Sequence, residues 1–399
     1  MKTKLYNTKI LTDAYSQIFD GEIVIQDDKI IFVGEKFNGE VDDKIDCNGN
    51  LLMAGFINCH AHSPMTLLKG VGQGETLENW LFKHIIQKEK IFTEQDIYNG
   101  SILAIKEMLK GGITCFQDNY FYPEITAKAC QDMGIRAVIS LSQNYSHSTF
   151  LSKQELEKLY LNLKDKYPLV DCNFYCHSIY TCNEQQFFDT IELAKKYGKL
   201  MCTHSSETLT EVGECTQTHA GQTPTILLDS FGFFDIKSMF AHGVFLQKED
   251  YEILKDKQTS VVHNPSSNLK LGSGIANLKA LIQNDINICL GTDGSSSNDR
   301  LDMFREMYLA STLQKAIFND PKLVDASQTI AMATQNGAKA LGRDDIGKLK
   351  VGNYADMIMI DLNGIDNAVK NDIKSNLVYA CSTEDVLMTM VNGKIVYKK

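Results

Sequence analysis

The chain alternates two kinds of hydrophobic pattern over most of its length. Short continuous apolar runs are followed by longer segments in which apolar residues recur every three or four positions. The first pattern is typical of strands buried in a parallel sheet, and the second is typical of amphipathic helices. The expected strands are Leu51–His62, Ile113–Asp118, Arg136–Gln143, Asn173–Tyr180, Lys199–Glu207, Ser238–Val244, Ser260–Ser266 and Ile286–Ser295. The clearest helical segments are Asp96–Lys110, Glu184–Tyr197 and Leu301–Ala316.

About eight such strand–helix units in roughly 290 residues predict the α/β class and a TIM-type (β/α)8 barrel, which usually has ~250 residues. Both ends of the chain are rich in short strands, with a hairpin pattern at Gly21–Gly34 and strands at Tyr354–Asp361 and Gly393–Tyr397. We therefore expect both termini to form one small β-sandwich domain, with the barrel inserted between them. The predicted parts are residues 1–54, 55–345 and 346–399. A doubly wound open sheet is the alternative fold.

Composition narrows the kinds of partner. The 399 residues are 43% hydrophobic and 23% charged, as in an ordinary globular protein, and carry a formal charge of −10. An acidic chain without a Lys/Arg-rich run is expected to bind neither nucleic acid nor a membrane surface. The start lacks a signal peptide, and no apolar run approaches the ~20 residues of a membrane span. We therefore expect a cytoplasmic protein whose 11 cysteines are thiols. We expect its partner to be a small-molecule substrate, and the chain could form a homo-oligomer.

Histidines end or follow the predicted strands with unusual regularity. In a closed parallel barrel the carboxyl ends of all strands open on one face, so these side chains would converge. The residues are His60 and His62 on the first strand, His177 on the fourth, His204 on the fifth, His242 on the sixth and His263 on the seventh, with Asp293 ending the eighth. A barrel interior tolerates so many polar groups only if they are paired or bind a ligand.

The His60-Ala61-His62 segment indicates a metal site. Residues two apart on a strand point to the same side, so both imidazoles can reach one ion. Together with His204 and Asp293 they offer three nitrogen ligands and one oxygen ligand. We expect one divalent ion, Zn²⁺ by preference, although Fe²⁺ and Mn²⁺ accept the same ligands.

Other catalytic patterns are missing from the sequence. It contains no His-Glu-x-x-His helix, no Gly-x-Ser-x-Gly elbow and no Pro-Cys-x-x-Cys element. Gly70-Val71-Gly72-Gln73-Gly74 matches neither phosphate-binding fingerprint, and we interpret it as a flexible loop near the site.

A family resemblance follows from the motifs around these residues. The chain resembles the amidohydrolase superfamily, and within it the deaminases of 5′-methylthioadenosine and S-adenosylhomocysteine and the related halotriazine hydrolases. The similarity extends over essentially the whole chain. Its motifs are Gly55–His62, Met65–Gly70, His177–Cys182, His204–Thr208, Ala241–Gly243, Val262–Leu271, Gly291–Gly294 and Leu301–Phe304, with Ala355–Ile358 and Val391–Lys394 in the small domain.

The resemblance implies a role for each position. His60, His62, His204 and Asp293 would be the metal ligands of a mononuclear site. Glu207 matches the glutamate that moves protons, His242 the histidine that assists the attacking water, and His177 a histidine that contacts substrate. Glu89 stands where the family places a carboxylate on the ribose hydroxyls. His263 is expected to have a supporting or structural role.

These roles imply hydrolytic deamination of an adenosine-type nucleoside. Metal-activated water would attack C6 of the adenine while Asp293 accepts a proton, His242 orients the water, and Glu207 protonates the ring nitrogen and assists the departing ammonia.

One departure from the family pattern bears on the substrate. Deaminases that accept S-adenosylhomocysteine tend to place an Arg after the third strand, but here Leu141 stands near that position, and Arg136 lies too early in the strand. A buried substrate carboxylate without a cation is poorly compensated, so we expect a preference for 5′-methylthioadenosine, 5′-deoxyadenosine or another neutral substrate.

Two other functions are compatible with the sequence. The same metal site could serve an aminohydrolase or chlorohydrolase of guanine, a pterin, cytosine or a triazine. A non-catalytic scaffold barrel is disfavoured, because such proteins tend to lose metal ligands, whereas every ligand position is filled here.

Overall fold

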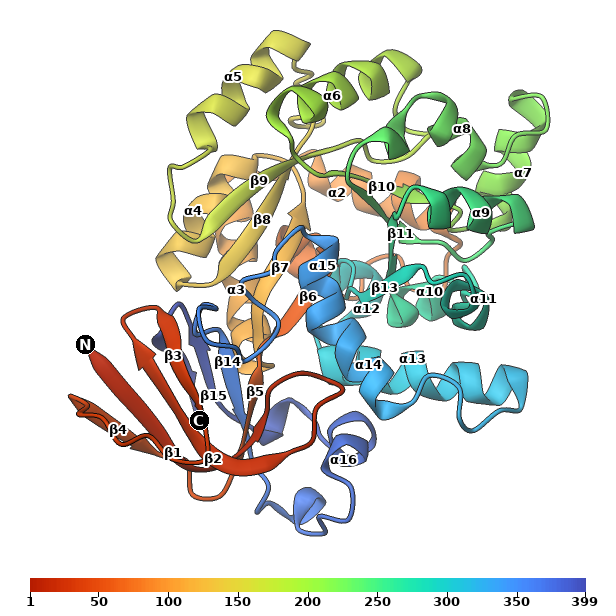
Figure 1. The fold of residues 1–399 in the computed structure, drawn as a ribbon. Coiled ribbons are helices and arrows are strands. Elements are labelled where there is room, and N and C mark those ends of the chain that lie inside the picture. Colours follow the sequence, from red (N-terminus) through yellow and green to blue (C-terminus); the bar gives the residue numbers. More distant parts are fainter.

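The computed structural model describes residues 1–399, apart from the side chain of Ile365. Figure 1 shows a barrel of strands wrapped by helices, with a separate sheet built from the red and blue ends of the chain. Across the described residues, eight parallel strands form the barrel in chain order. They are β6 (Phe56–Ala61), β7 (Ile113–Asn119), β8 (Arg136–Leu141), β9 (Val170–Tyr175), β10 (Met201–Ser205), β11 (Ser238–His242), β12 (Ser260–His263) and β13 (Asn287–Leu290). The predicted (β/α)8 fold class is confirmed.

The first and last barrel strands meet at the carboxyl end. Ala61 and Asp293 form a parallel bridge, and the backbone N–H of Asp293 donates to the carbonyl of His60 at 2.9 Å. Because all strands run in one direction, their carboxyl ends surround a single mouth, which is where such barrels place their active sites.

Helices follow the barrel strands and cover them from outside. The predicted helix Glu184–Tyr197 matches α6, and the other two predicted helices differ from α3 and α13 by two residues at one or both ends. Helix α3 starts at Glu94 because Thr93 forms a capping box with Asp96. The α-helices are α1 (Leu77–Asn79), α2 (Ile86–Glu89), α3 (Glu94–Lys110), α4 (Pro123–Met133), α5 (Lys153–Leu163), α6 (Glu184–Tyr197), α7 (Leu209–Thr218), α8 (Pro224–Ser230), α9 (Lys248–Asp256), α10 (Pro265–Lys270), α11 (Leu278–Gln283), α12 (Ser295–Asn298), α13 (Met303–Phe318), α14 (Ala326–Ala333), α15 (Gln335–Ala340) and α16 (Ile373–Tyr379). The 3₁₀ helices are η1 (Ser63–Leu68), η3 (Phe233–Asp235), η4 (Ile365–Asn367) and η5 (Thr383–Asp385), and η2 (Trp80–Ile85) is a π-helical segment.

The two ends of the chain share one sheet, as expected. Its strands are β1 (Lys2–Leu11), β2 (Phe19–Gln26), β3 (Lys29–Gly34), β4 (Asp43–Asp46), β5 (Leu51–Ala54), β14 (Met357–Ile360), β15 (Val386–Val391) and β16 (Lys394–Lys398). Strand β14 pairs antiparallel with β5, which joins the two halves into one continuous mixed sheet. Leu5, Ile23, Met357 and Met388 from both halves pack into one buried cluster.

The predicted strand Leu51–His62 is in fact two strands in different sheets. Strand β5 belongs to the terminal sheet and β6 to the barrel, and the chain passes between them at Gly55. A Cβ on Gly55 would lie 2.1 Å from Cγ2 of Thr114, so only glycine allows this approach. Both strands are fully buried and apolar, so hydrophobicity alone shows no break between them.

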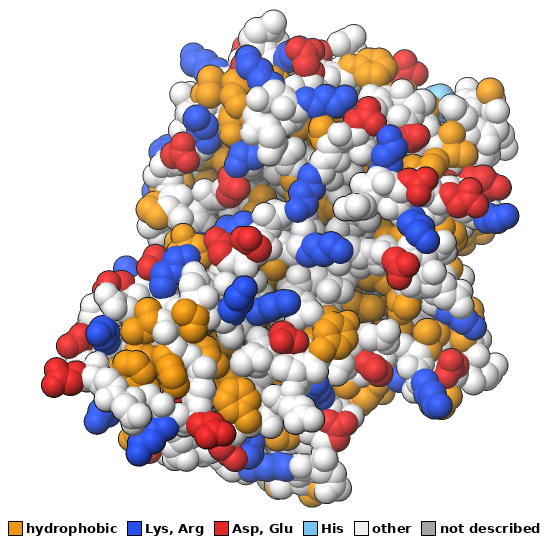
Figure 2. Space-filling model, viewed as in Figure 1, with side chains coloured by type: hydrophobic (Ala, Val, Ile, Leu, Met, Phe, Trp, Pro, Cys, Tyr) orange, Lys and Arg blue, Asp and Glu red, His pale blue; other side chains and the backbone are white. Residues whose placement is uncertain are grey.

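The visible face in Figure 2 mixes Lys and Arg side chains with Asp and Glu side chains, and apolar side chains gather at its lower left, over the terminal sheet. Within the described residues, none of the helices combines the length and the apolar character needed to cross a bilayer.

A buried ion pair joins the barrel to the terminal sheet. The guanidinium of Arg136, at the start of β8, donates to Asp356 at 2.7 and 3.1 Å, and the two side chains are 3% and 1% exposed. The same guanidinium lies over the ring of Tyr354 at 4.3 Å. The backbone N–H of Asn392 also donates to Asp356 at 2.7 Å, but Arg136 supplies the opposite charge from the barrel, which ties the two parts together.

Removing one partner of this pair should be costly. We expect Arg136→Met to lower the free energy of unfolding by about 3–5 kcal/mol, because Asp356 is left as an uncompensated buried charge. Urea unfolding measures the effect. Arg300→Met, at an exposed position, is the matched control and should stay within about 0.5 kcal/mol of the parent. A loss below about 1 kcal/mol for Arg136→Met would show that the pair does not hold the two parts together.

Candidate metal centre and active site

Three histidines and one aspartate converge at the mouth of the barrel. His60 lies near the end of β6 and His62 just after it, His204 lies on β10, and Asp293 follows β13. One nitrogen or oxygen atom from each of the four lies within 4.8 Å of the others, and all four residues are buried. The structure therefore brings together the ligand set that the sequence predicts, from the first, fifth and last strands of the barrel.

Backbone carbonyls orient two of these imidazoles. Nδ1 of His62 lies 2.6 Å from the carbonyl oxygen of Asn119, and Nδ1 of His204 lies 2.7 Å from that of His177. A carbonyl only accepts, so both Nδ1 atoms carry the proton and each Nε2 presents a lone pair. These Nε2 atoms are 3.3 Å apart, and His60 Nε2 lies 3.1 Å from that of His204. Two Nε2 lone pairs this close, with a third imidazole nitrogen beside them, fit a cation between them.

Asp293 supplies the oxygen ligand. Its Oδ1 lies 3.4 Å from Nε2 of His60 and 3.2 Å from Nε2 of His62. Its other oxygen, Oδ2, accepts hydrogen bonds from Ser267 at 2.6 Å and Ser297 at 3.1 Å. Oδ1 also accepts the backbone N–H of Gly294 at 2.8 Å, and it faces the imidazoles. A carboxylate oxygen beside three imidazoles is a donor set that suits Zn²⁺ and that Fe²⁺ and Mn²⁺ also accept.

Glu207 and His242 lie next to this cluster. Glu207 Oε2 is 3.6 Å from Nε2 of His242, whose Nδ1 donates to the side-chain oxygen of Asn268 at 2.8 Å. The backbone N–H of Glu207 donates to Glu211 at 2.7 Å, which fixes the loop after β10. Burial raises the pKa of the Glu207 carboxyl above its ordinary value, against the opposing effect of His242. A carboxyl that keeps its proton nearer to neutral pH can act as an acid as well as a base.

The two remaining strand-end histidines differ in their surroundings. His177 lines the cavity, with Nδ1 2.8 Å from Oγ1 of Thr181, and burial lowers its pKa to about 3, so it is neutral. His263 is buried, and neither of its ring nitrogens has a hydrogen-bond partner among the described residues. His263 does not line the cavity and makes no hydrogen bond to the described residues that do. A structural role therefore remains our expectation for it.

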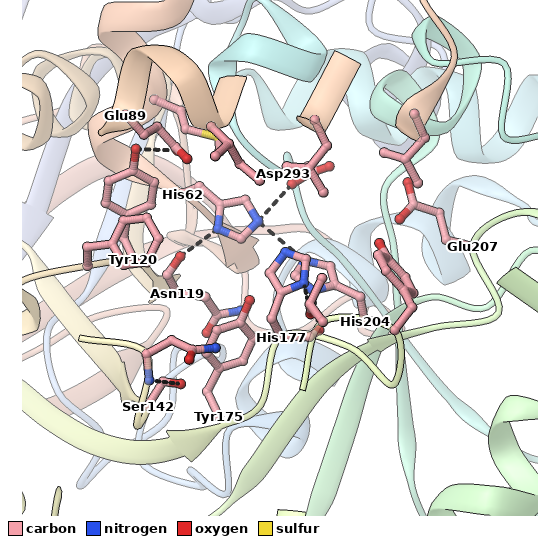
Figure 3. A pocket seen from close by; sticks show the side chains of 18 of the residues that line it. His62, Glu89, Asn119, Tyr120, Ser142, Tyr175, His177, His204, Glu207 and Asp293 are labelled. Atoms are coloured by element: carbon pink, nitrogen blue, oxygen red, sulfur yellow. Dashed lines mark hydrogen bonds and ion pairs between the residues drawn. The ribbon is translucent and has the colours of Figure 1, made fainter. Parts of the chain in front are cut away.

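A cavity of about 300 Å³ extends from the cluster. In Figure 3, Glu207 lies at one end, His62, His204 and Asp293 lie between, and Glu89, Tyr120 and Ser142 lie at the other end. One wall is apolar and comes from the segment that leads from the glycine-rich turns into α2. Its residues are Leu77, Trp80, Leu81 and Ile86. The elongated shape separates a polar reacting end from a distant recognition end.

Glu89 lies at the recognition end, where its carboxylate meets two donors. Tyr120 Oη donates to Oε1 at 2.5 Å, and His147 Nε2 donates to Oε2 at 3.1 Å. Neither donor was expected from the sequence, because none of the motifs includes Tyr120 or His147, and His147 lies in a loop without hydrophobic periodicity. Ser267 was also missed, although it lies inside the quoted motif Val262–Leu271.

Leu141, which stands near the position where the family pattern places an Arg, does not line the cavity. Leu141 ends β8 and is fully buried, while Arg136 is held at the other end of that strand by Asp356. Among the described residues that line the cavity there is no Lys or Arg. At the recognition end, the imidazole of His147 contacts the carboxylate of Glu89 at 3.1 Å.

Comparison with curated proteins gives relatives along the full chain. A 5-methylthioadenosine/S-adenosylhomocysteine deaminase of Thermococcus sibiricus is 38% identical over 384 residues, which is 95% of this chain and 90% of the relative. A 5′-deoxyadenosine deaminase of Methanosphaera stadtmanae is 37% identical and covers 98% of this chain and 92% of the relative.

Solved structures share the fold. An adenosine deaminase from Xanthomonas campestris with bound zinc has a TM-score of 0.92 at 30% identity, over 99% of this chain and 92% of the other. An atrazine chlorohydrolase from Arthrobacter aurescens, complexed with zinc, has a TM-score of 0.90 at 23% identity over 98% and 94%, a level at which only the fold is informative. The family model described as the amidohydrolase family matches residues 51–396. This chain belongs to the amidohydrolase family.

Proposed function

We propose that this protein is a metal-dependent hydrolase that deaminates an adenosine-type nucleoside with a neutral 5′ substituent. One observation carries the proposal: a single cavity joins the His₃Asp cluster and Glu207 at one end to the carboxylate of Glu89 at the other. The first end suits attack on an aminated ring, and the second suits hydroxyl donors. The names of the full-length relatives support the same reaction.

His60, His62, His204 and Asp293 would hold one divalent ion, for which we propose Zn²⁺. Three imidazoles and one carboxylate are a common zinc donor set, and a structural relative is described with bound zinc. When bound, such an ion makes water a good nucleophile near neutral pH by lowering the pKa of that water to about 7.

The surrounding side chains move the protons. Asp293 lies at the ligand cluster and accepts a proton from the attacking water, while His242 orients that water through Nε2 because Asn268 holds its other nitrogen. Glu207, whose pKa is raised by burial, donates a proton to the ring nitrogen beside C6. A carbon–oxygen bond forms and the carbon–nitrogen bond breaks. The amine leaves as ammonia after it receives the proton that Asp293 took from the attacking water. The second proton of that water passes to Glu207 as the C6 carbonyl forms, which restores the Glu207 carboxyl.

The recognition end favours a neutral substituent. The apolar wall of Leu77, Leu81 and Ile86 can cover a methylthio or methyl group, and the described lining offers no Lys or Arg for a carboxylate. A charged amino-acid tail would lose hydration without a compensating partner. His177 is neutral and lines the cavity, which supports a contact with the nucleoside between the two ends.

Ammonia release across a panel of substrates tests the function. We expect kcat/KM to be highest for 5′-methylthioadenosine or 5′-deoxyadenosine, and at least about tenfold lower for S-adenosylhomocysteine, because its carboxylate meets no cation. Guanine, a pterin, cytosine and a chlorotriazine complete the panel, with chloride release followed for the last. A higher kcat/KM for S-adenosylhomocysteine would reject the proposed preference for a neutral 5′ substituent. Turnover of only the free bases or the triazine would reject a nucleoside as the substrate.

Metal removal should abolish turnover. The purified protein should contain about one divalent ion per chain by elemental analysis, and a chelator should remove both the ion and the activity, which added Zn²⁺ restores. His204→Asn should lose the ion, whereas His219→Asn, outside the cavity, should keep it. Full activity in a metal-free preparation would contradict the proposed centre.

Glu207→Gln should separate proton transfer from metal binding. Glutamine keeps the shape but holds no transferable proton, so we expect kcat to fall by about 10²–10⁴-fold while the metal content is unchanged. Glu214→Gln on the exposed side of α7 is the matched control and should leave kcat at the parental value. Near-parental turnover of Glu207→Gln with metal bound would remove Glu207 from the mechanism.

A further inference from the structure

The carboxylate of Glu89 is held from two sides. Its side chain is 4% exposed, and each oxygen accepts one hydrogen bond, Oε1 from Tyr120 and Oε2 from His147. Tyr120 follows β7, and Glu89 ends α2, so the two donors and the acceptor come from three different elements. A buried carboxylate held on both oxygens has a fixed plane and cannot turn to suit an arbitrary ligand.

His147 reaches Glu89 from the tip of a folded loop. The loop joins β8 to α5, and a bridge between Asn144 and Phe150 folds it back on itself. Reciprocal backbone hydrogen bonds between Ser146 and Thr149 close the tip around His147. The imidazole packs against the ring of Phe121 at a centroid distance of 4.5 Å, and only 19% of the side chain is exposed. The loop therefore presents this one side chain to the cavity in a defined position.

The arrangement leaves a particular pattern of free acceptor sites. An ionised carboxylate offers about four lone-pair sites, and here one on each oxygen is taken. The remaining site on each oxygen can accept a hydrogen bond, and Glu89 lines the cavity. Two acceptors side by side in a fixed plane match two hydroxyl groups on neighbouring carbons.

We propose that His147 is a positioning residue that fixes Glu89 for a vicinal diol, and so makes the cavity selective for ribonucleosides over deoxynucleosides. This inference rests on the proposed function, because the diol is that of the ribose ring. His147 acts through Glu89 rather than on the reacting atoms. Tyr120 donates only to Oε1, so loss of His147 leaves Oε2 without a donor. The carboxylate can then rotate out of the plane in which its two oxygens face a diol.

The test compares the binding of two reaction products, which the enzyme does not consume. The products 5′-deoxyinosine and 2′,5′-dideoxyinosine differ only in one hydroxyl of the diol. Trp80 lines the cavity and is the single tryptophan of the chain, so its fluorescence in the metal-loaded protein reports their Kd values. The parent protein should bind the diol about 10- to 100-fold more tightly, as expected for a hydrogen bond to a charged acceptor.

Variants then assign the discrimination to His147. His147→Ala should weaken binding of the diol by about tenfold and leave the dideoxy compound unchanged, so that the ratio of Kd values falls by about tenfold. His147→Gln retains an N–H donor and should recover part of the ratio. Thr149→Ala, at an exposed position in the same loop tip, is the matched control and should retain the parental ratio.

The outcomes separate this inference from the proposed function. An unchanged ratio in His147→Ala, or an equal loss for both compounds, would overturn the role of His147, because a merely structural loop contact affects both alike. Absence of ammonia release from every nucleoside, together with a His147-dependent binding ratio, would reject the deaminase and keep the diol site. Failure of the parent protein to bind either compound would reject the diol site, and the ammonia-release assay would decide the deaminase separately.

Discussion

The closure of the barrel between β6 and β13 is the contact on which the site depends. The hydrogen bond from the N–H of Asp293 to the carbonyl of His60 joins the first strand of the barrel to the segment after the last. It places the carboxylate of Asp293 beside the imidazoles of His60 and His62, which are far from it in sequence. A sheet that stayed open at this seam would separate the same four ligands across its whole width.

The site also requires hydrogen-bond partners for its buried polar groups, because the mouth of the barrel is polar and largely closed to solvent. Each buried polar group there needs a partner, and the backbone supplies several of them, such as the carbonyls behind His62 and His204. His242 and Asp293 also adopt positive φ angles of 79° and 60°, which non-glycine residues rarely take. Such backbone strain is kept where the surrounding structure fixes it, and here it turns both side chains toward the cluster.

The two ends of the cavity are built in different ways. The metal end consists of strand ends, whose positions follow from the barrel itself. The recognition end consists of α2 and the loops after β7 and β8, and the carboxylate of Glu89 on α2 joins the two loops by accepting hydrogen bonds from Tyr120 and His147. Proteins that share this barrel can therefore recognise different substrates, because their loops can change without disturbing the barrel.

The sequence by itself determined the order of strands and helices, the fold class and the convergence of His60, His62, His204 and Asp293. These depend on local periodicity and on one rule, that parallel strands end on the same face. Only the tertiary structure decided that Leu51–His62 divides at Gly55, that serines hold Asp293, and that His147 reaches Glu89. Each of these depends on which distant segment lies opposite, which no local pattern encodes.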